Sequence, residues 1–512
     1  MQTVLSFLPI LVLLFCLLVL KLPAGKAGAA SMLLALVIAV SAFGLDAFGL
    51  TVAMGKGMSL ALYVLLIIWA AVFLYHLVAE FKATEVINRN IVLLIRDPFV
   101  QFLTLAWLFS AVLQGIAGFG VPVIIVVPIL VELGFNPVAS TAAVLIGHSW
   151  AVTFGSMGSS FFTMYLVTGI PQRYLGITMG IFDVVAMLCT GLAVCYLYGG
   201  WEYVRKGLKY VLPTVAIMSV VLFTTVKLEM VSLVGLMSAL SGLLFMYFLY
   251  QKTSRAGLPK QLFANALNLG QAVLPYGAII GLSLLFQILK LGSISLAFRF
   301  PGFTTALGYA VKAENAYSRI KLFGHPAPVI LISALAAFLV YKKVGIWSAE
   351  RFRSVLDKTV TKCVSTSISL MFLIIMALIM MDSGMTNQFA VSIAGLAGSY
   401  YPLLAPFFGV LGSFITGSNT NSNVIFGRFQ YSVAQSIGVS ETVMCGAQSI
   451  GGSVGVSMGP TTVLMGASAA KLVGEESLVY RKVLIPTLLT ALALGIVNYL
   501  LLIQFGYSVG AM

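Results

Sequence analysis

Apolar runs long enough to cross a lipid bilayer recur along almost the whole sequence, and they restrict the chain to very few folds. Runs at about 2–20, 29–50 and 58–79 have the length of a helix that spans the hydrocarbon core. Further runs follow, up to a last one at about 483–504. Hydrophobic residues make up 60% of the chain and charged residues 9%, which is more apolar surface than a soluble core can bury. The sequence therefore predicts an all-α polytopic membrane protein.

Positive charge is concentrated in short loops between the apolar runs. The net charge is +14, and Lys and Arg cluster at 205–209, 252–260 and 342–353. Because cytoplasmic loops of membrane proteins are enriched in these residues, the pattern predicts that the three loops are cytoplasmic and that the protein is multi-pass in the plasma (inner) membrane. It does not indicate nucleic acid as a partner, since no soluble basic domain is present. The lipid bilayer is the first predicted partner.

A polar stretch joins two apolar runs, 401–416 and 424–437, that are each too short to cross a bilayer. The residues between them, 417–423, are all small or carry an amide or hydroxyl group. Irregular backbone at membrane depth is tolerated only where protein or a water-filled cavity satisfies its polar groups. We therefore predict a re-entrant helical hairpin at about 401–437, with a transport site at its turn rather than a polar packing turn.

A second pair of short apolar runs, 99–113 and 121–131, is joined by the glycine-rich stretch 114–120. No strand precedes these glycines, so a dinucleotide-binding turn is excluded. Glycines at a turn let the backbone approach a ligand closely. The stretch therefore predicts another re-entrant hairpin at about 99–133, which comes before the 401–437 hairpin in the chain.

The two hairpins belong to halves that repeat about 300 positions apart. The predicted first half is 1–250, the linker is 251–269 and the second half is 270–512. Each hairpin is followed by a helix that breaks at small residues, near 155–160 and near 451–460. Paired interrupted helices in corresponding positions indicate the binding site of a transporter.

The phrases at 115–122, 152–158, 382–386 and 411–423 resemble those of the lactate permease family. The resemblance implies a secondary active permease for small organic anions, lactate or glycolate, in symport with a cation. It also implies a fold of the ion transporter superfamily, with an elevator-type arrangement and a possible homodimer. The stretch 418–420 is similar to the hairpin signature of dicarboxylate–sodium symporters.

The candidate substrate- and ion-binding residues come from both hairpins and both broken helices. Side-chain oxygens and amides there can ligate a cation or bind a hydroxy acid, and backbone N–H groups after the second turn can take a carboxylate. They are Gly115, Ala117, Gly118, Phe119, Gly120, His148, Ser149, Gly155, Ser156, Ser418, Asn419, Thr420, Asn421, Ser422, Asn423, Gln448, Ser449 and Ser453.

Four further residues are candidates for coupling transport to an ion: Asp46, Asp183, Gln114 and Arg428. Asp46 and Asp183 are the acids placed deepest in apolar runs; each can carry a proton or be satisfied by neighbouring polar groups. The resemblance implies proton coupling. Gln114 and Asn419 stand where the family often has acids, which weakens that assignment and keeps sodium coupling as the alternative. Arg428 can pair with a substrate carboxylate or extend to the membrane surface.

Other functional classes lack their sequence signals. There is no His-Glu-x-x-His zinc motif and no nucleotide-binding loop in the sequence. We therefore predict no catalytic residues, no metal centre and no cofactor besides the transported proton or sodium ion, and the protein is not expected to be an enzyme. An anion channel is less favoured, because two closed hairpins indicate alternating access.

Overall fold

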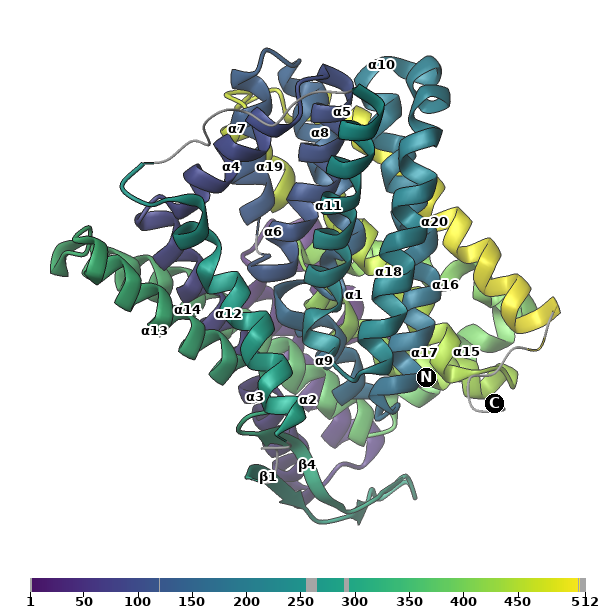
Figure 1. Cartoon of the computed structure of the whole chain (residues 1–512). Helices are drawn as coiled ribbons and strands as arrows, with labels where there is room; N and C mark the ends of the chain where they lie inside the picture. The colour runs from purple at the N-terminus through teal and green to yellow at the C-terminus, as the bar shows by residue number, and fades with distance from the viewer. Residues whose placement is uncertain (1, 119, 255–264, 290–293, 505, 507–512) are drawn as a thin grey trace.

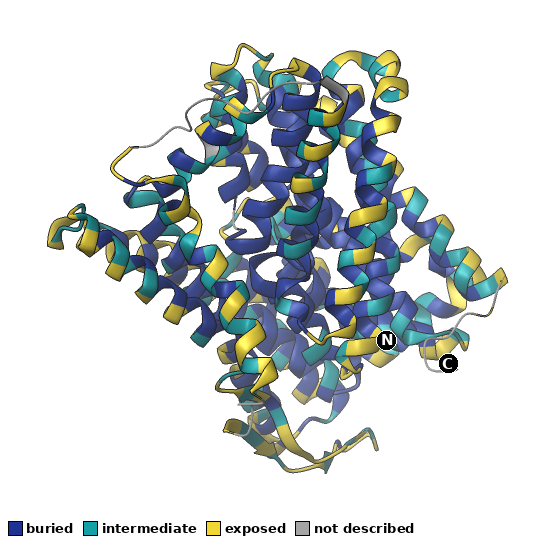
Figure 2. Cartoon of the chain, in the orientation of Figure 1, coloured by how far each residue is buried: buried dark blue, intermediate teal, exposed yellow. Residues whose placement is uncertain are grey.

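Ten helices that are long and apolar enough to cross a membrane form most of the part of the chain that the structure describes. The computed structural model describes residues 2–118, 120–254, 265–289, 294–504 and 506. Buried residues concentrate in the central helices, and exposed residues lie on the outer helices and the strands (Figure 1, Figure 2). On one outer helix Leu331, Leu335 and Leu339 are 48%, 55% and 56% exposed, as expected of a face in contact with lipid. The predicted class, a polytopic helical membrane protein, is confirmed.

The N-terminal helices differ from the predicted runs at one break. The predicted run 29–50 is divided, because Gly44 adopts a left-handed backbone (φ 66°) that ends one helix. Asp46 then caps the next helix by accepting the Gly49 N–H at 2.7 Å. Asp46 is exposed, so the prediction that it lies deep in an apolar run is wrong. The helices are α1 (Gln2–Leu18), α2 (Ala24–Phe43), α3 (Ala47–Glu80) and α4 (Ala83–Leu94).

The next segments include the first glycine-rich turn and the first broken helix. Helix α10 is itself interrupted at Gly199 and Gly200, whose backbone angles are not helical. The elements are α5 (Pro98–Leu103), the π-helix η1 (Thr104–Phe109), α6 (Ser110–Ile116), α7 (Val121–Glu132), α8 (Pro137–Gly147), the 3-10 helix η2 (Ser149–Val152), α9 (Gly155–Thr168), α10 (Gln172–Lys227), the 3-10 helix η3 (Val231–Leu233) and α11 (Val234–Ser254).

A small strand region departs from the all-α prediction. Strand β1 (Ser295–Phe300) pairs antiparallel with β4 (Glu314–Lys321), and β2 (Phe303–Thr304) pairs with β3 (Ala310–Val311). These strands project beyond the helices at the lower end of the molecule (Figure 1), between α12 (Leu269–Ile288) and α13 (Pro326–Val344). The predicted linker 251–269 falls largely on 255–264, outside the described residues.

The C-terminal helices contain the second polar turn. Helices α16 and α17 on either side of it contact each other, and α17 also packs against α9 of the N-terminal part. The elements are α14 (Ala349–Asp382), α15 (Met385–Ala397), the 3-10 helix η4 (Gly398–Tyr400), α16 (Tyr401–Thr416), α17 (Asn419–Ile437), α18 (Glu441–Gly455), the 3-10 helix η5 (Val456–Met458), α19 (Pro460–Ala469), α20 (Glu476–Tyr499) and the π-helix η6 (Leu500–Gln504).

Helices α3 and α14 form the most extensive helix pair and are held by a buried ion pair. Lys56 Nζ of α3 lies 3.2 Å from Asp382 Oδ2 of α14, with side chains 5% and 9% exposed. Two charges this far from water stabilise the structure only while both are present, because either one alone would be an uncompensated buried charge.

We expect Asp382→Asn to destabilise the protein by about 3–5 kcal/mol, since it leaves the Lys56 ammonium buried without a counter-charge. The measurement is the midpoint of thermal unfolding of the purified protein in detergent. The control is Lys206→Gln, which removes an exposed ion pair to Glu202 and should cost less than about 1 kcal/mol. Equal shifts for the two variants would contradict this account of the ion pair.

Candidate functional site

The polar residues predicted for the site meet where the broken helices cross. After η2, residues Ser156 and Met157 have φ of 48° and 55°, and Gly158 has φ of 82°. Left-handed backbone at consecutive non-glycine residues is uncommon and is held only by strong surrounding contacts. The predicted break at 155–160 is confirmed, and so is that near 451–460, where α18 gives way to η5 and α19.

Hydrogen bonds join the two broken helices across about 300 sequence positions. The Thr153 N–H donates to Ser453 Oγ at 3.0 Å, and Ser453 Oγ donates to the Ser149 carbonyl at 2.6 Å. Thr153 Oγ1 donates to the Ser449 carbonyl at 3.1 Å. It also accepts from Asn419 Nδ2 at 2.9 Å. Thr153 therefore links both breaks to the start of α17.

A second set of hydrogen bonds fixes the first turns of α17. Asn423 Nδ2 donates to the Ser160 carbonyl and to Ser449 Oγ, both at 2.9 Å. The hydroxyls of Ser160 and Thr420 lie 3.0 Å apart. Because these contacts come from α9, α17 and α18, the polar start of α17 is built into the interior instead of facing solvent.

Three buried amide oxygens in this network accept no hydrogen bond from the described residues. They are Asn419 Oδ1, Asn423 Oδ1 and Gln448 Oε1. The Gln448 amide nitrogen is occupied, since it donates to Ser422 Oγ at 3.2 Å. A buried acceptor without a donor costs about 1–3 kcal/mol. Amide oxygens are also ligands for hard cations, so this set is chemically suited to a water molecule or a cation.

The first glycine-rich turn packs directly on the first broken helix. Gly118 has φ of 59°, and a Cβ there would collide with the Ser156 hydroxyl. The Ser156 hydroxyl itself donates to the Ala117 carbonyl at 3.3 Å. The Gln114 side chain lies against Gly155, where a Cβ would be 2.8 Å from Nε2. Phe119, which is one of the predicted binding residues of this turn, lies outside the described residues.

The second turn is closed by a glycine and a capping serine. Gly417 (φ 69°) ends α16, and a Cβ there would collide with Thr461 Oγ1 of α19. Ser418 caps α17 by accepting the Asn421 N–H at 3.4 Å. The cap takes the Asn421 N–H and the Ser418 carbonyl takes the Ser422 N–H. The N–H groups of Asn419 and Thr420 are therefore left at the start of this 19-residue helix, where they favour a negative ligand.

A cavity of about 550 Å³ lies between the two turns, within the usual size range of small-molecule sites. Its lining, as far as the described residues show, contains one Lys, no Arg and no Asp or Glu. The lysine is Lys362 of α14. We refer to this space as the site cavity. The predicted residues that line it are Gln114, Gly120, His148, Ser156, Ser418, Asn419, Thr420 and Asn421.

The remaining predicted binding residues lie around the site cavity without lining it. Several of them take part in the hydrogen bonds above, and the glycines allow close backbone packing, as at Gly115, where a Cβ would be 2.8 Å from the Leu236 backbone. These residues are Gly115, Ala117, Gly118, Ser149, Gly155, Ser422, Asn423, Gln448, Ser449 and Ser453.

His148 is fixed by its own helix. Its Nδ1 lies 2.5 Å from the Val144 carbonyl, and the side chain is buried. Because a carbonyl only accepts hydrogen bonds, Nδ1 carries a proton, and Nε2 is the ring nitrogen left for another partner. His148 lines the site cavity, so this geometry is compatible both with a structural role and with contact to a ligand.

The predicted coupling residues are placed differently from one another. Asp183 of α10 is fully buried, and neither of its carboxyl oxygens has a hydrogen-bond partner among the described residues. Arg428 stacks 4.4 Å from the centre of the Tyr431 ring and donates to the Thr168 carbonyl at 3.4 Å. Asp183, Arg428 and Asp46 do not line the site cavity. Gln114 and Asn419 do line it.

Several residues at the site were not predicted from the sequence. Thr153 and Ser160 lie beside predicted residues and are central to the hydrogen bonds, and the polar row of α14 contributes Lys362, Ser365 and Ser369 to the cavity. The signal for this row was hydroxyl residues at intervals of three to four within an apolar run. This signal could not be assigned to the site from the sequence, because the sequence does not show which helix faces the broken helices.

A polytopic helical bundle with a polar cavity built on two broken helices belongs to the class of membrane transporters. Comparison with known families identifies which one: the family model described as L-lactate permease matches residues 2–505. The chain therefore belongs to the L-lactate permease family and is a multi-pass protein of the cell membrane.

Characterised relatives are similar over most of their length. Glycolate permease GlcA of Escherichia coli (strain K12) is 26% identical, with 98% of this chain and 95% of the relative covered. The L-lactate permease of Streptococcus iniae is 27% identical, covering 86% and 92%. The L-lactate permease of Bacillus subtilis (strain 168) is 25% identical, covering 97% and 95%.

We expect Gly118→Ala to lower stability by about 2–4 kcal/mol, because it adds left-handed backbone strain of about 1–2 kcal/mol to a collision with Ser156. The matched control is Gly134→Ala. Gly134 has φ of 89° with nothing within 4 Å of a Cβ, so only the strain applies. Thermal unfolding in detergent compares the two variants, and equal midpoints would contradict close packing of the turn on Ser156.

Proposed function

We propose that this protein is a secondary active transporter that carries a small 2-hydroxymonocarboxylate, such as lactate or glycolate, together with a cation. The relatives named L-lactate permease and glycolate permease support the substrate class. The observation that carries the proposal is the lining of the site cavity, which combines hydroxyl and amide groups with Lys362 and, in its described part, no carboxylate. The positive charge and the hydroxyl and amide groups favour an organic anion over a cation.

The start of α17 is the proposed position of the substrate carboxylate. Ser418, Asn419, Thr420 and Asn421 all line the cavity at this helix end, where free backbone N–H groups and the helix dipole stabilise negative charge. The 2-hydroxyl group would then bind the hydroxyls and amides that face the same space, among them Ser156 of α9. The resulting site uses both turns at once.

We further propose that the two turns are the tips of re-entrant hairpins in an inverted repeat. Contacts between the two halves support this, because α17 of the second half packs against α9 of the first, and α7 of the first packs against α19 of the second. The unit formed by both hairpins and both broken helices would move against α2, α3, α13 and α14, as an elevator does. The helices of the latter group pack mainly on one another, which suits a stationary scaffold.

Proton coupling is supported by Asp183. A carboxylate buried without a partner is costly to keep charged, so it would exchange a proton between states that differ in its access to water. Asp183 lies on α10, which packs against both α8 and α18. Its helix thus contacts the proposed moving unit, and Asp183 does not line the site cavity.

Sodium coupling is the second candidate, and the amide oxygens of Asn419, Asn423 and Gln448 support it. All three are buried and accept no hydrogen bond from the described chain. A sodium ion bound to them would compensate their lost hydrogen bonds and the charge of the substrate at the same time.

The proposed function predicts uptake of labelled lactate and glycolate into proteoliposomes. We expect uptake to be saturable and to rise with an inward proton gradient, because co-transport of a cation offsets the cost of bringing an anion into a negative interior. Parallel reactions use an inward sodium gradient or no gradient. Stimulation by sodium alone would move the coupling site to the amide oxygens, and no uptake under any condition would contradict the substrate class.

A carboxyl-to-amide change tests the coupling residue. We expect Asp183→Asn to abolish gradient-driven accumulation while exchange of external for internal substrate continues, since the amide keeps the shape but cannot carry a proton. Asp46→Asn is the matched control; it should accumulate substrate normally, because an amide also caps the helix there. Normal proton-driven accumulation by Asp183→Asn would exclude Asp183 as the proton carrier.

A further inference from the structure

A second pocket, which is shallow and largely open to the outside, adjoins the site cavity along α14. It also has a volume of about 550 Å³, and its lining residues are His76, Asp357, Lys358, Thr361, Lys362, Ser365 and Thr366. We call it the vestibule. Lys362, Ser365 and Thr366 line the vestibule and the site cavity alike. The two spaces therefore meet at these three residues.

One face of α14 runs from the vestibule into the site cavity. Lys358, Lys362, Ser365 and Ser369 follow at intervals of three and four residues, which places them on one side of a helix. Lys358 lines the vestibule only, Ser369 lines the site cavity only, and Lys362 and Ser365 line both. This face thus offers charged and hydroxyl groups in sequence along the route.

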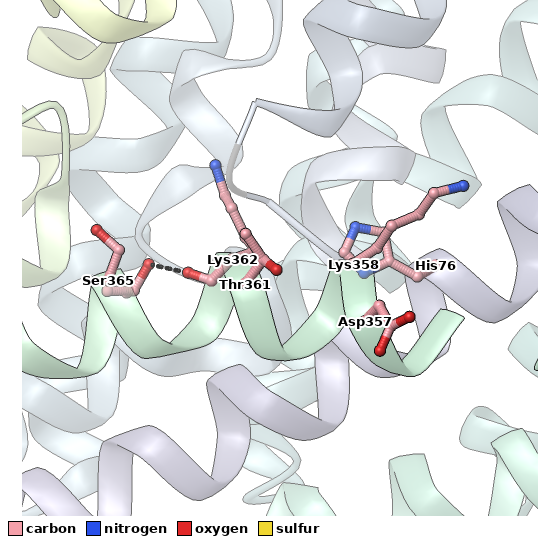
Figure 3. A pocket seen from close by; sticks show the side chains of 7 residues that line it. His76, Asp357, Lys358, Thr361, Lys362 and Ser365 are labelled. Atoms are coloured by element: carbon pink, nitrogen blue, oxygen red, sulfur yellow. Dashed lines mark hydrogen bonds between the residues drawn. The ribbon is translucent and has the colours of Figure 1, made fainter. Parts of the chain in front are cut away.

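The two lysines of this face differ in their electrostatic surroundings. Lys358 Nζ lies 2.6 Å from Glu80 Oε2, so its charge is compensated. The Asp357 carboxylate points to the opposite side of α14 from the Lys362 ammonium (Figure 3). No described carboxylate lies within ion-pair distance of Lys362. Lys362 is accordingly the uncompensated positive charge at the junction.

Two side chains of the vestibule form their hydrogen bonds with groups other than the Lys362 ammonium. Thr366 Oγ1 donates to the Lys362 carbonyl of its own helix at 3.1 Å, and His76 Nδ1 lies 3.0 Å from Thr359 Oγ1 on the side of α3. Neither contact involves the Lys362 ammonium. Lys362 and Ser365 are both exposed, as side chains in the wall of a water-filled space would be.

We propose that Lys362 is the anion-selecting residue between the vestibule and the site cavity, and that carboxylates reach the site along this face of α14. The charge raises the local concentration of anions at the junction and repels cations. Ser365 supplies a hydroxyl donor at the same point. The identity of the anion as a carboxylate rests on the proposed function, whereas the positive potential at the junction does not.

Uptake kinetics test the effect on substrate. We expect Lys362→Gln to raise the KM for lactate by about tenfold at low ionic strength, because loss of one charge on the entry route lowers the local concentration of the anion. The maximal rate should change by less than about twofold, because Lys362 stands at the junction and away from the start of α17. Lys362→Arg should keep the normal KM, and raising the salt concentration should weaken the difference.

Lys343→Gln is the matched control for these measurements. Lys343 is exposed near the end of α13 and lines neither the vestibule nor the site cavity. The Lys343→Gln variant should therefore leave the KM for lactate unchanged. If Lys362→Gln also leaves the KM unchanged, Lys362 serves only as a membrane-surface anchor and the proposal is wrong.

Thiol modification tests the potential without any transport. Ser365→Cys is treated with an anionic sulfonatoethyl and a cationic trimethylammonioethyl methanethiosulfonate reagent, with and without Lys362→Gln. We expect removal of Lys362 to lower the ratio of the anionic to the cationic rate by about fivefold or more. Cys16, Cys195, Cys363 and Cys445 are buried, and Cys189 is partly buried, so the unsubstituted protein gives the background rate.

The two experiments separate the proposal from the function on which it partly rests. A changed thiol ratio with no lactate uptake in the unsubstituted protein would support the anion-selecting junction and reject the hydroxymonocarboxylate substrate. If removal of Lys362 leaves the ratio of the anionic to the cationic modification rate unchanged, the proposed anion-selecting role of Lys362 is wrong even where uptake is normal. A changed ratio together with a raised KM is the result that we expect.

Discussion

The site depends on the hydrogen bonds that replace those lost where two helices break inside the protein. A broken helix leaves backbone N–H and C=O groups that bilayer and apolar side chains cannot satisfy. Here the Thr153 N–H and the Ser149 carbonyl are both satisfied by the Ser453 hydroxyl. The second broken helix thus supplies partners for the first, whereas the Val456 and Gly459 carbonyls at the second break accept from the Thr462 hydroxyl of their own segment. A chain without the second broken helix would bury unsatisfied groups at the first break.

These hydrogen bonds also explain which groups are left for a ligand. The donors of Asn419, Asn423 and Gln448 are used within the protein, whereas their amide oxygens accept nothing from the described residues. The backbone N–H groups left at the start of α17 are hydrogen-bond donors, whereas these amide oxygens are acceptors. Acceptors and donors are therefore left at neighbouring places, which is the arrangement that a cation and an anion bound together would require.

The sequence was sufficient to predict the helical class and the positions of both turns and both breaks, because glycines, short polar stretches and apolar run lengths are local signals. It misled at Asp46, where a three-residue break between two helices hid a helix cap inside an apolar run. The strands between 295 and 321 were missed because they carry no clear alternation. Lys362 could not be assigned, since one lysine in a long helix acquires meaning only from the helices opposite it.

The position of Lys362 has a consequence for the proposed movement. It belongs to α14, in the scaffold group, whereas Ser156 and the start of α17 belong to the unit that would move. A ligand can shift a conformational equilibrium only if it binds the two states with different affinity. Since an anion in the cavity would approach Lys362 in one position of the moving unit and leave it in the other, this lysine would favour one state when substrate is bound. The same charge that selects the anion would then contribute to the direction of the movement.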